Sequence, residues 1–339
     1  MKIRGHRVSR VLIIKRDGLR SFIEAEPTFA AIREAHEGAT IDLVTSAGLQ
    51  RLAKTAPYFD RVVATPQGLA PAQRKEFAGQ LKRVGYGMAY DLDGTRDSMD
   101  LRAAMKGFRG PQWVAPKKPS AAPRRLLAPS PFAGAATRKL LQDAGLPLVE
   151  RLPAMRWLDD PANASANLDP SWFGISGDFA LFVPATNPNH RWPAECYGEV
   201  AAMMGAEGVT PVIIGGQELG PFAYDVMQHA AEISRATGRA AVDLTGKTDA
   251  AQLAVLARDA RFFLAGPSEE VHLVAAAGTP GVVLVPASED LGGDALYGRH
   301  VVKLVAGNMA NVTPELATST LRNMGLIRGA AATGGRAFA

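Results

Sequence analysis

The sequence contains few of the residues that define extracellular or membrane-spanning proteins. It has one cysteine, Cys196, which cannot form an intrachain disulfide and therefore fits a reducing compartment. The apolar run Val11 to Ile14 is too short for a signal-peptide core or a membrane span. We expect a cytoplasmic protein, with peripheral association at the inner membrane as an alternative that the net charge of +5 leaves open.

Several common types of site are also missing from the sequence. Aromatic residues make up 7% of the chain, and no recognition helix or zinc-finger pattern is present, so nucleic acid is not an expected partner. Without a His-x-x-x-His pair or a cysteine cluster, the sequence predicts no metal site, and we expect no cofactor. Hydrolase, P-loop and dinucleotide-binding proteins are disfavoured as well, because their glycine-containing signatures are absent.

What the sequence does contain is a regular alternation of short β-branched runs and longer amphipathic stretches. With 339 residues, 47% of them hydrophobic and 21% charged, the chain has the size and composition of two folded domains. The alternation predicts an α/β fold with mostly parallel sheets and helices on both faces. Predicted strands are 11–14, 41–44, 61–64, 88–92, 112–114, 179–183, 211–214, 241–244, 262–264 and 281–285; predicted helices are 21–35, 71–82 and 96–106, with others starting near 193, 219, 250 and 269.

Composition also indicates where the domains end. The stretch from Pro153 to Asp178 is rich in aspartate, proline and glycine and indicates the passage between them. We therefore predict one domain over 1–165, a second over 166–328 and a frayed tail over 329–339. The basic loop from Ala115 to Pro131 is either a solvated loop or a surface for an anionic acceptor or lipid.

The turn from Lys15 to Ser21 is the first candidate site. Ligands of open parallel sheets bind beyond the carboxyl ends of the strands, and two such domains facing one another would line a central cleft with these turns. Lys15, Arg16 and Arg20 surround a predicted helix start, with Ser21 as its cap, and would attract a phosphate or sugar acid. The alternative is ordinary surface in which Asp17 pairs with these cations.

The second candidate is the turn 184–193 after the first strand of the second half. Its Thr186 and Asn187 offer hydrogen bonds, and His190 and Arg191 offer positive charge. A loop histidine without a ligand is the alternative.

Two later turns complete the set. Glu218 follows the glycine pair 215–216 and would accept hydrogen bonds from a ribose diol, unless the glycines serve only a tight turn. Ser268 is a predicted helix cap beside amides that could receive a diphosphate. The alternative for this turn is that Glu269 and Glu270 serve the helix dipole.

Taken in order, six segments resemble the bacterial heptosyltransferases, the ADP-heptose-dependent glycosyltransferases of lipopolysaccharide core assembly. They are VLIIK with Pro27, YGMAYDLDGTRDS, VPATNPNHRWP, IIGGQE, DLTGKTD and SEEVHLVAAAGTP. The second is similar to the family's YDxxIDLQGxxRS and the third to its PGAS…KRWP. The resemblance implies a GT-B fold, in which an acceptor-side and a nucleotide-sugar-side Rossmann-like domain face a central cleft.

The resemblance also implies an ADP-sugar donor, a glycan or lipid-linked acceptor and a set of binding residues. On the donor side these are Thr186, Asn187, His190, Arg191, Glu218, Ser268, Glu269 and His272. On the acceptor side they are Lys15, Arg16, Arg20 and Arg96. His190 occupies the family's lysine position, so a permanent charge has become a titratable one.

At two positions the chain departs from the family. Ser21 stands where the family has its catalytic aspartate, with Arg20 in place of the preceding glycine. Pro267 and Glu269 replace the Asp and Gly of its DSG or DTG element. A serine hydroxyl cannot act unaided as a general base.

These departures leave two functions open. The first is an active inverting glycosyltransferase in which Asp17, Glu24 or Glu269 supplies the missing carboxylate, with Ser21 and Asp17 as the catalytic candidates. The second is an inactive pseudo-glycosyltransferase that binds a protein partner, a nucleotide or a glycan.

Overall fold

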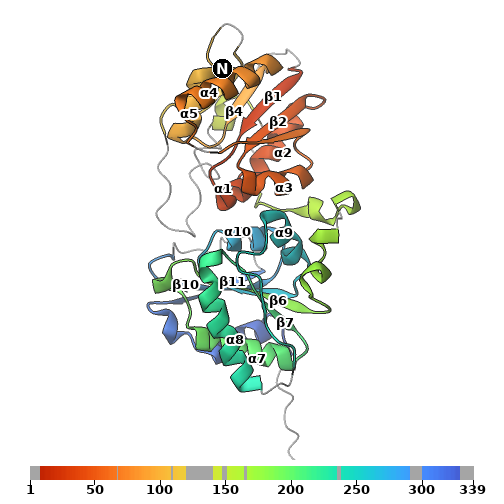
Figure 1. Ribbon diagram of the computed structural model, residues 1–339, viewed down its shortest axis with the longest axis vertical. Helices are drawn as coiled ribbons and strands as arrows, with labels where there is room; N and C mark the ends of the chain where they lie inside the picture. Colours follow the sequence, from red (N-terminus) through yellow and green to blue (C-terminus); the bar gives the residue numbers. More distant parts are fainter. Residues whose placement is uncertain are drawn as a thin grey trace, which may run out of the picture. The chain divides into compact units, whose positions relative to one another are not determined.

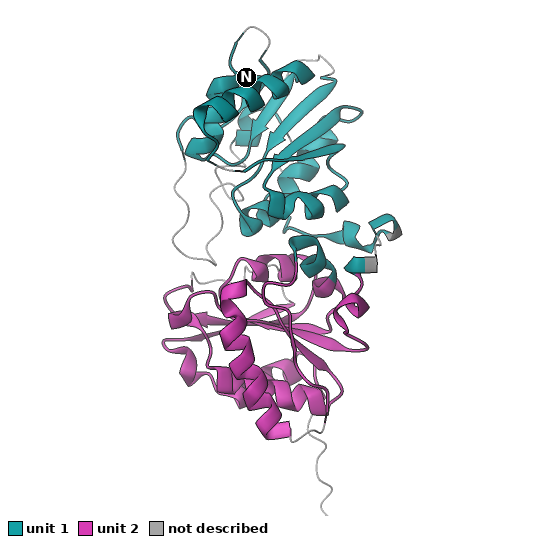
Figure 2. Ribbon diagram, in the orientation of Figure 1, with its two compact units in different colours: residues 1–168, 249–255 teal, residues 169–248, 256–339 magenta. Residues whose placement is uncertain are grey.

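The computed structural model describes residues 8–66, 68–107, 110–119, 140–146, 151–163, 166–234, 238–290 and 300–328 (Figure 1). The chain forms two compact units, one of residues 1–168 with 249–255 and one of residues 169–248 with 256–339 (Figure 2). Each unit is built on one all-parallel sheet. The predicted α/β class with two Rossmann-like parallel-sheet domains is confirmed. The tail 329–339 and most of the basic loop lie outside the described residues.

The sheet of unit 1 has the strand order β3-β2-β1-β4-β5. Its central strands β1 and β4 pair in parallel, with Val11 opposite Met88 and Ile14 opposite Asp91. Apolar side chains on both faces explain why these strands read as continuous hydrophobic runs, since helices cover both faces of a parallel sheet. The strand bounds are β1 Arg10–Ile14, β2 Thr40–Thr45, β3 Arg61–Ala64, β4 Met88–Asp91 and β5 Gln112–Val114.

The predicted helix 21–35 is two helices, α1 (Leu19–Glu24) and α2 (Glu26–Ala35). Pro27 has no N–H to donate to the carbonyl four residues earlier, so the helix is interrupted at Ala25. Gly18, with φ 120°, takes the N-cap position of α1. The prediction that Ser21 caps this helix is therefore wrong, because Ser21 lies inside it.

The other helices of unit 1 follow the predicted alternation, with one addition. They are α3 (Ala47–Thr55), which the sequence reading did not predict, α4 (Pro71–Val84) and α5 (Arg96–Met105). Helix α5 begins at a hydroxyl cap, since the Thr95 side chain accepts a hydrogen bond from the Ser98 amide at 3.2 Å.

The chain after residue 150 is held on α2 by a buried carboxylate. Glu26, 1% exposed, accepts hydrogen bonds from both terminal nitrogens of Arg151, from the Tyr58 hydroxyl and, at 3.2 Å, from the Ala154 amide. Trp157 adds an edge contact with the Tyr58 ring at 5.5 Å. This segment therefore packs as part of unit 1.

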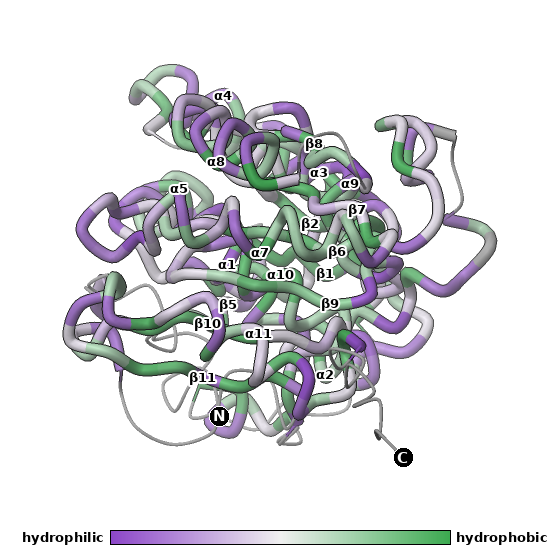
Figure 3. The backbone as a smooth tube through the Cα atoms, turned by 90° about the horizontal axis from the view of Figure 1, so that it is seen from below, coloured by the Kyte–Doolittle hydropathy of each residue, from purple (hydrophilic) through white to green (hydrophobic). Residues whose placement is uncertain are grey.

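The sheet of unit 2 has the strand order β11-β10-β9-β6-β7-β8. Its central strands carry only buried residues, and Figure 3 colours β6, β9 and β10 largely as hydrophobic. The strand bounds are β6 Phe179–Val183, β7 Thr210–Ile213, β8 Val242–Asp243, β9 Phe262–Ala265, β10 Gly281–Pro286 and β11 Val301–Ala306. The last strand, β11, was not predicted.

Five helices among the described residues accompany this sheet, and one of them, 250–259, begins within unit 1. Four start within one residue of the predicted positions: α7 (Ala194–Ala206), α8 (Gly220–Ser234), α9 (Ala250–Asp259) and α10 (Glu270–Ala276). The fifth, α11 (Pro314–Asn323), begins at Thr313, whose hydroxyl accepts the Leu316 amide at 3.2 Å, and was not predicted.

Strand order locates the candidate site in each unit. In unit 1 the order reverses between β1 and β4, and in unit 2 it reverses between β6 and β9. Ligands of doubly wound sheets bind outside the carboxyl ends of the strands at this reversal. The turns after β1, β4, β6 and β9 are thus the places where chemistry is expected. Among the described residues, no helix has the length and apolar character needed to cross a membrane.

Two helical glycines make a matched test of the packing. A Cβ at Gly205, on α7, would overlap the carbonyl oxygen of Arg239, whereas a Cβ at Gly79, on α4, would meet nothing within 4 Å. Gly205→Ala should lower the free energy of unfolding by about 1–3 kcal/mol through overpacking. Gly79→Ala should raise it by about 0.5–1 kcal/mol, because alanine is the better helix former. Urea unfolding followed by circular dichroism measures both, and equal midpoints would contradict the packing described.

Candidate functional site

The turn after β1 is organised by the buried ammonium of Lys15. Its Nζ atom donates hydrogen bonds to Ser21 Oγ at 2.6 Å and to the Leu92 carbonyl at 3.0 Å, and it lies 2.8 Å from Asp17 Oδ1. Lys15 is 0% exposed, and an ammonium removed from water needs partners of this kind. Leu92 follows β4, so this one cation joins the turns after the two central strands.

Ser21 and Asp17 are bound to one another as well as to Lys15. Ser21 Oγ donates a hydrogen bond to Asp17 Oδ2 at 2.8 Å, so both carboxylate oxygens of Asp17 are engaged within the turn. The Asp17 side chain retains 18% exposure, whereas Lys15 is completely covered. A carboxylate therefore stands within hydrogen-bonding distance of the Ser21 side chain, at the edge of the sheet and accessible to solvent.

A second ion-pair group lies directly beside the first. Asp93 accepts hydrogen bonds from the backbone amide of Arg16 and, at 3.2 Å, from Arg16 Nε. The other end of the guanidinium contacts Asp97, with 2.7 Å between Nη2 and Oδ2. Burial and, next, the neighbouring Asp17 carboxylate raise the pKa of Asp93 to about 7, against the opposing effect of Lys15 and Arg16.

Sequence reasoning missed Asp93 and Asp97. Both lie in the segment YGMAYDLDGTRDS, whose family counterpart has glutamine and arginine at these two positions. The departure was readable in the sequence, but its partner, Arg16, lies 77 residues away from Asp93. Only the pairing of β1 with β4 brings the two turns together.

The cations predicted to bind an acceptor differ in how available they are. Lys15 and Arg16 are buried and paired with carboxylates of the protein. Arg20 lies inside α1 and is 9% exposed. Arg96 is open to solvent, with 82% of its side chain exposed and its Nε 3.5 Å from Asp100 Oδ1.

In unit 2 the turns after β6 and β9 touch through their backbones. The Thr186 amide donates a hydrogen bond to the Pro267 carbonyl at 3.3 Å, and the Gly266 amide donates one to the Val183 carbonyl at 2.8 Å. A Cβ at Gly266 would lie 2.8 Å from Ala185, so only glycine fits between the two turns. The two predicted donor-side turns are therefore neighbours within this unit.

Arg191 holds the turn after β6 in shape. Its Nε donates to the Ala185 carbonyl at 2.9 Å and its Nη2 to the Thr186 carbonyl at 3.0 Å, while its Cζ lies 4.9 Å from the centre of the Phe222 ring. Burial lowers the pKa of this guanidinium, against the opposing effect of nearby groups that include Glu218. Arg191 thus stabilises the loop that carries the other predicted donor residues.

The remaining polar groups of that turn form a looser set. Asn187 accepts the Asn189 amide at 3.0 Å, and its Nδ2 lies 3.5 Å from His190 Nδ1. His190 Nδ1 also lies 3.7 Å from Glu289 Oε1, a contact that becomes an ion pair when the imidazole is protonated.

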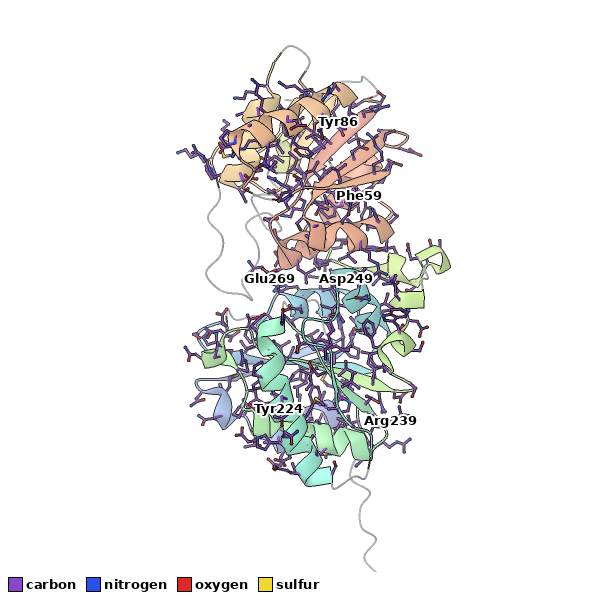
Figure 4. The ribbon with its side chains drawn as sticks, in the orientation of Figure 1. Phe59, Tyr86, Tyr224, Arg239, Asp249 and Glu269 are labelled. Carbon is purple, nitrogen blue, oxygen red and sulfur yellow. The ribbon has the colours of Figure 1, made fainter. Side chains whose placement is uncertain are left out.

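The turn after β9 carries acidic residues. Ser268 Oγ accepts the Val271 amide at 3.3 Å, but the N-cap of α10 is Glu269, one residue after the cap predicted from the sequence, and His272 is buried on α10. Burial raises the pKa of Glu270, and the neighbouring carboxylates of Glu269 and Glu218 raise it further against a hydrogen bond from Ser268. Glu269, which is labelled in Figure 4, is the residue directly before α10.

Replacing Arg191 tests its part in shaping the loop. A lysine cannot bind the Ala185 and Thr186 carbonyls with two nitrogens while stacking on Phe222, so Arg191→Lys should loosen the turn. We expect faster hydrogen exchange in peptides covering 184–192, equivalent to a loss of about 1–2 kcal/mol of local stability. Arg96→Lys is the exposed control and should leave exchange in this loop unchanged. Identical protection in both variants would contradict the assignment.

Comparison with known protein families finds the family that the sequence motifs resemble. The sequence model of glycosyltransferase family 9 (heptosyltransferase) matches residues 136–293, a range that contains all three candidate turns of unit 2. A sequence comparison with curated proteins finds no match. The predicted resemblance to the heptosyltransferases is thus confirmed over this range.

Solved structures agree over nearly the whole chain. The ADP-heptose LPS heptosyltransferase II of E. coli superimposes with a TM-score of 0.71 at 18% identity, covering 93% of this chain and 98% of that one. A family 9 glycosyltransferase of Veillonella parvula gives 0.72 at 15% identity, covering 96% and 99%. The E. coli heptosyltransferase WaaC, solved with ADP-2-deoxy-2-fluoro heptose, gives 0.65 at 18% identity, covering 93% and 99%. These likenesses establish the GT-B fold.

Proposed function

We propose that this chain is a glycosyltransferase that moves a sugar from an ADP-sugar to a hydroxyl of a lipopolysaccharide-type or other glycan acceptor, with Asp17 as the general base. The observation that carries the proposal is the 2.8 Å hydrogen bond between Ser21 Oγ and Asp17 Oδ2. The serine at the family's aspartate position is thereby joined to a carboxylate four residues earlier. The required functional group is present at the turn, although the residue that supplies it has changed.

The other two carboxylates considered from the sequence are less suited to this role. Glu24 lies further along α1 and is 8% exposed, so an acceptor has little access to it. Glu269 belongs to unit 2, beside the turn proposed for the donor. Asp17 combines contact with Ser21 and partial exposure, which favours it as the base.

The reaction requires one proton transfer and one exchange of carbon–oxygen bonds. The acceptor hydroxyl oxygen attacks the anomeric carbon of the donor, and the bond from that carbon to the diphosphate oxygen breaks, so ADP leaves with the electron pair. The hydroxyl proton passes to the Asp17 carboxylate as the new bond forms. The Lys15 ammonium and the Ser21 hydroxyl orient that carboxylate within the turn.

For the donor we propose the turns of unit 2. Thr186, Asn187 and His190 offer hydrogen bonds and a titratable charge in a loop that Arg191 holds in shape. Ser268, Glu269 and His272 lie at the neighbouring turn, and Glu218 follows β7. Glu270, whose pKa is raised by burial, begins the helix that follows this second turn.

Asp17→Asn is the direct test of the base. It should lower kcat by about 10²- to 10⁴-fold, the usual contribution of general-base catalysis, and leave the dissociation constant for ADP unchanged. Isothermal titration with ADP and ADP-heptose measures binding, and ADP release with and without lipopolysaccharide acceptor measures turnover. Glu24→Gln is the matched control and should retain activity.

The outcomes distinguish an enzyme with Asp17 as its base, an inactive nucleotide-binding protein and a protein that binds no nucleotide. Turnover that survives Asp17→Asn would show that Asp17 is not the base. Nucleotide binding without turnover in the unaltered chain would favour the alternative, an inactive pseudo-glycosyltransferase that serves as a binding or scaffold subunit. Absence of nucleotide binding would remove both the enzyme and the nucleotide-sensor forms.

Exchanging the two residues gives a second test. Ser21→Asp alone places a second carboxylate beside Asp17, and repulsion between them should reduce activity. Combined with Asp17→Ser, the same change restores one carboxylate, one hydroxyl and the ammonium of Lys15 between them. We expect the double variant to be at least tenfold more active than Asp17→Ser alone in the ADP-release assay. Equal activity of the two would show that position 21 can no longer carry the base.

A further inference from the structure

Asp93 is a fully buried carboxylate whose contacts converge on the residue next to the proposed base. It accepts the backbone amide of Arg16, the residue that precedes Asp17, and it also accepts the Arg16 side chain at 3.2 Å. Through these two bonds the turn after β4 fixes both the main chain and the side chain of the turn after β1. A displacement of Asp93 would therefore move Asp17.

We propose that Asp93 is a positioning residue for catalysis: its bonds to the Arg16 main chain and side chain fix the turn that carries Asp17. The inference rests on the proposed function of Asp17. The Asp17 carboxylate is also close enough to disfavour the ionised form of Asp93, so the two residues are linked by charge as well as by geometry.

The neighbouring charges explain why the fold tolerates the carboxylates of Asp17 and Asp93 so close together. From the turn after β1, Lys15 contacts Asp17 and Arg16 contacts Asp93. From α5, Asp97 contacts the far end of the Arg16 guanidinium at 2.7 Å. Arg16 also acts on the Asp91 carboxylate, which lies 3.8 Å from Arg102 of α5, so each carboxylate of this group has a cation beside it.

Electrostatics link Asp93 to Asp17 as well. The pKa of Asp93 is raised to about 7, first by burial and next by the Asp17 carboxylate. Removing the Asp17 charge should therefore lower the pH at which Asp93 binds its proton. The geometry and the charge both link Asp93 to the turn that carries Asp17.

Asp93→Asn tests the inference by activity. The amide oxygen can still accept the Arg16 amide, but the negative charge is lost. We expect kcat to fall by up to about 10²-fold, because the neutral amide holds the Arg16 side chain less firmly and the turn that carries Asp17 loosens. KM for the ADP-sugar should not change.

A matched control separates these effects from general damage. Asp60 also accepts a backbone amide, that of Ile41 at 2.7 Å, and an arginine side chain, Arg33 Nη2 at 2.7 Å, but it precedes β3 at the opposite edge of the sheet. Asp60→Asn therefore makes the same chemical change away from the site. It should leave kcat unaltered.

A second arm needs no enzymatic activity. Carboxyl-carbon NMR of aspartate-labelled protein should show Asp93 titrating near pH 7, and Asp17→Asn should lower that midpoint, whereas Asp60→Asn should not. An Asp93 titration that does not respond to Asp17→Asn would overturn the inference even if transfer activity is found. A response in a chain without turnover would leave the coupling standing and remove only the proposed function.

Stability against pH supplies a third readout with a fixed sign. The pKa of Asp93 in the folded chain, about 7, lies above its ordinary value of 3.8, so its proton binding stabilises the fold fully below about pH 4 and this contribution is lost as the pH rises through 7. The melting temperature of Asp93→Asn relative to the unaltered chain should therefore increase between pH 4 and pH 8. A constant difference over this range would contradict the raised pKa.

Discussion

The buried ammonium of Lys15 is the constraint on which the first unit's site depends. A charge without water must be paired, and leaving it unpaired would destabilise the fold by several kcal/mol. Ser21, Asp17 and the Leu92 carbonyl satisfy it together, which fixes the turn after β1 against the turn after β4. The accessible carboxylate of Asp17 is a consequence of this arrangement. Its position is set by the need to neutralise a cation that the fold has already buried.

In the second unit, two turns are held together by backbone contacts instead of by a buried charge. Its turns after β6 and β9 approach through backbone hydrogen bonds, and the space between them admits only the glycine at 266. Arg191 donates hydrogen bonds to two carbonyls of its own loop, those of Ala185 and Thr186. A rigid backbone with few charges paired inside the protein suits the binding of a ligand. Paired charges around a partly exposed carboxylate suit proton transfer.

Hydrophobic periodicity was sufficient to predict most strands, the parallel sheets and the turns of the candidate site, because these depend on neighbouring residues. It failed at local breaks of the backbone and where the decisive partner is distant in sequence. The break at Ala25 and the cap at Gly18 follow from Pro27 and a left-handed glycine, and both were misjudged as one helix beginning at Ser21. Asp93 gave no local signal of its role, since its importance arises only from the register between β1 and β4.

The attachment of Glu26 to Arg151 has a practical consequence for dividing the chain. A fragment that ends before residue 151 would contain the whole first sheet, yet it would leave a carboxylate that is 1% exposed without its guanidinium partner. A fragment of this unit should therefore extend at least through Trp157, so that the packing on Tyr58 is kept. The first residues after position 150 are therefore stabilised by contacts with unit 1.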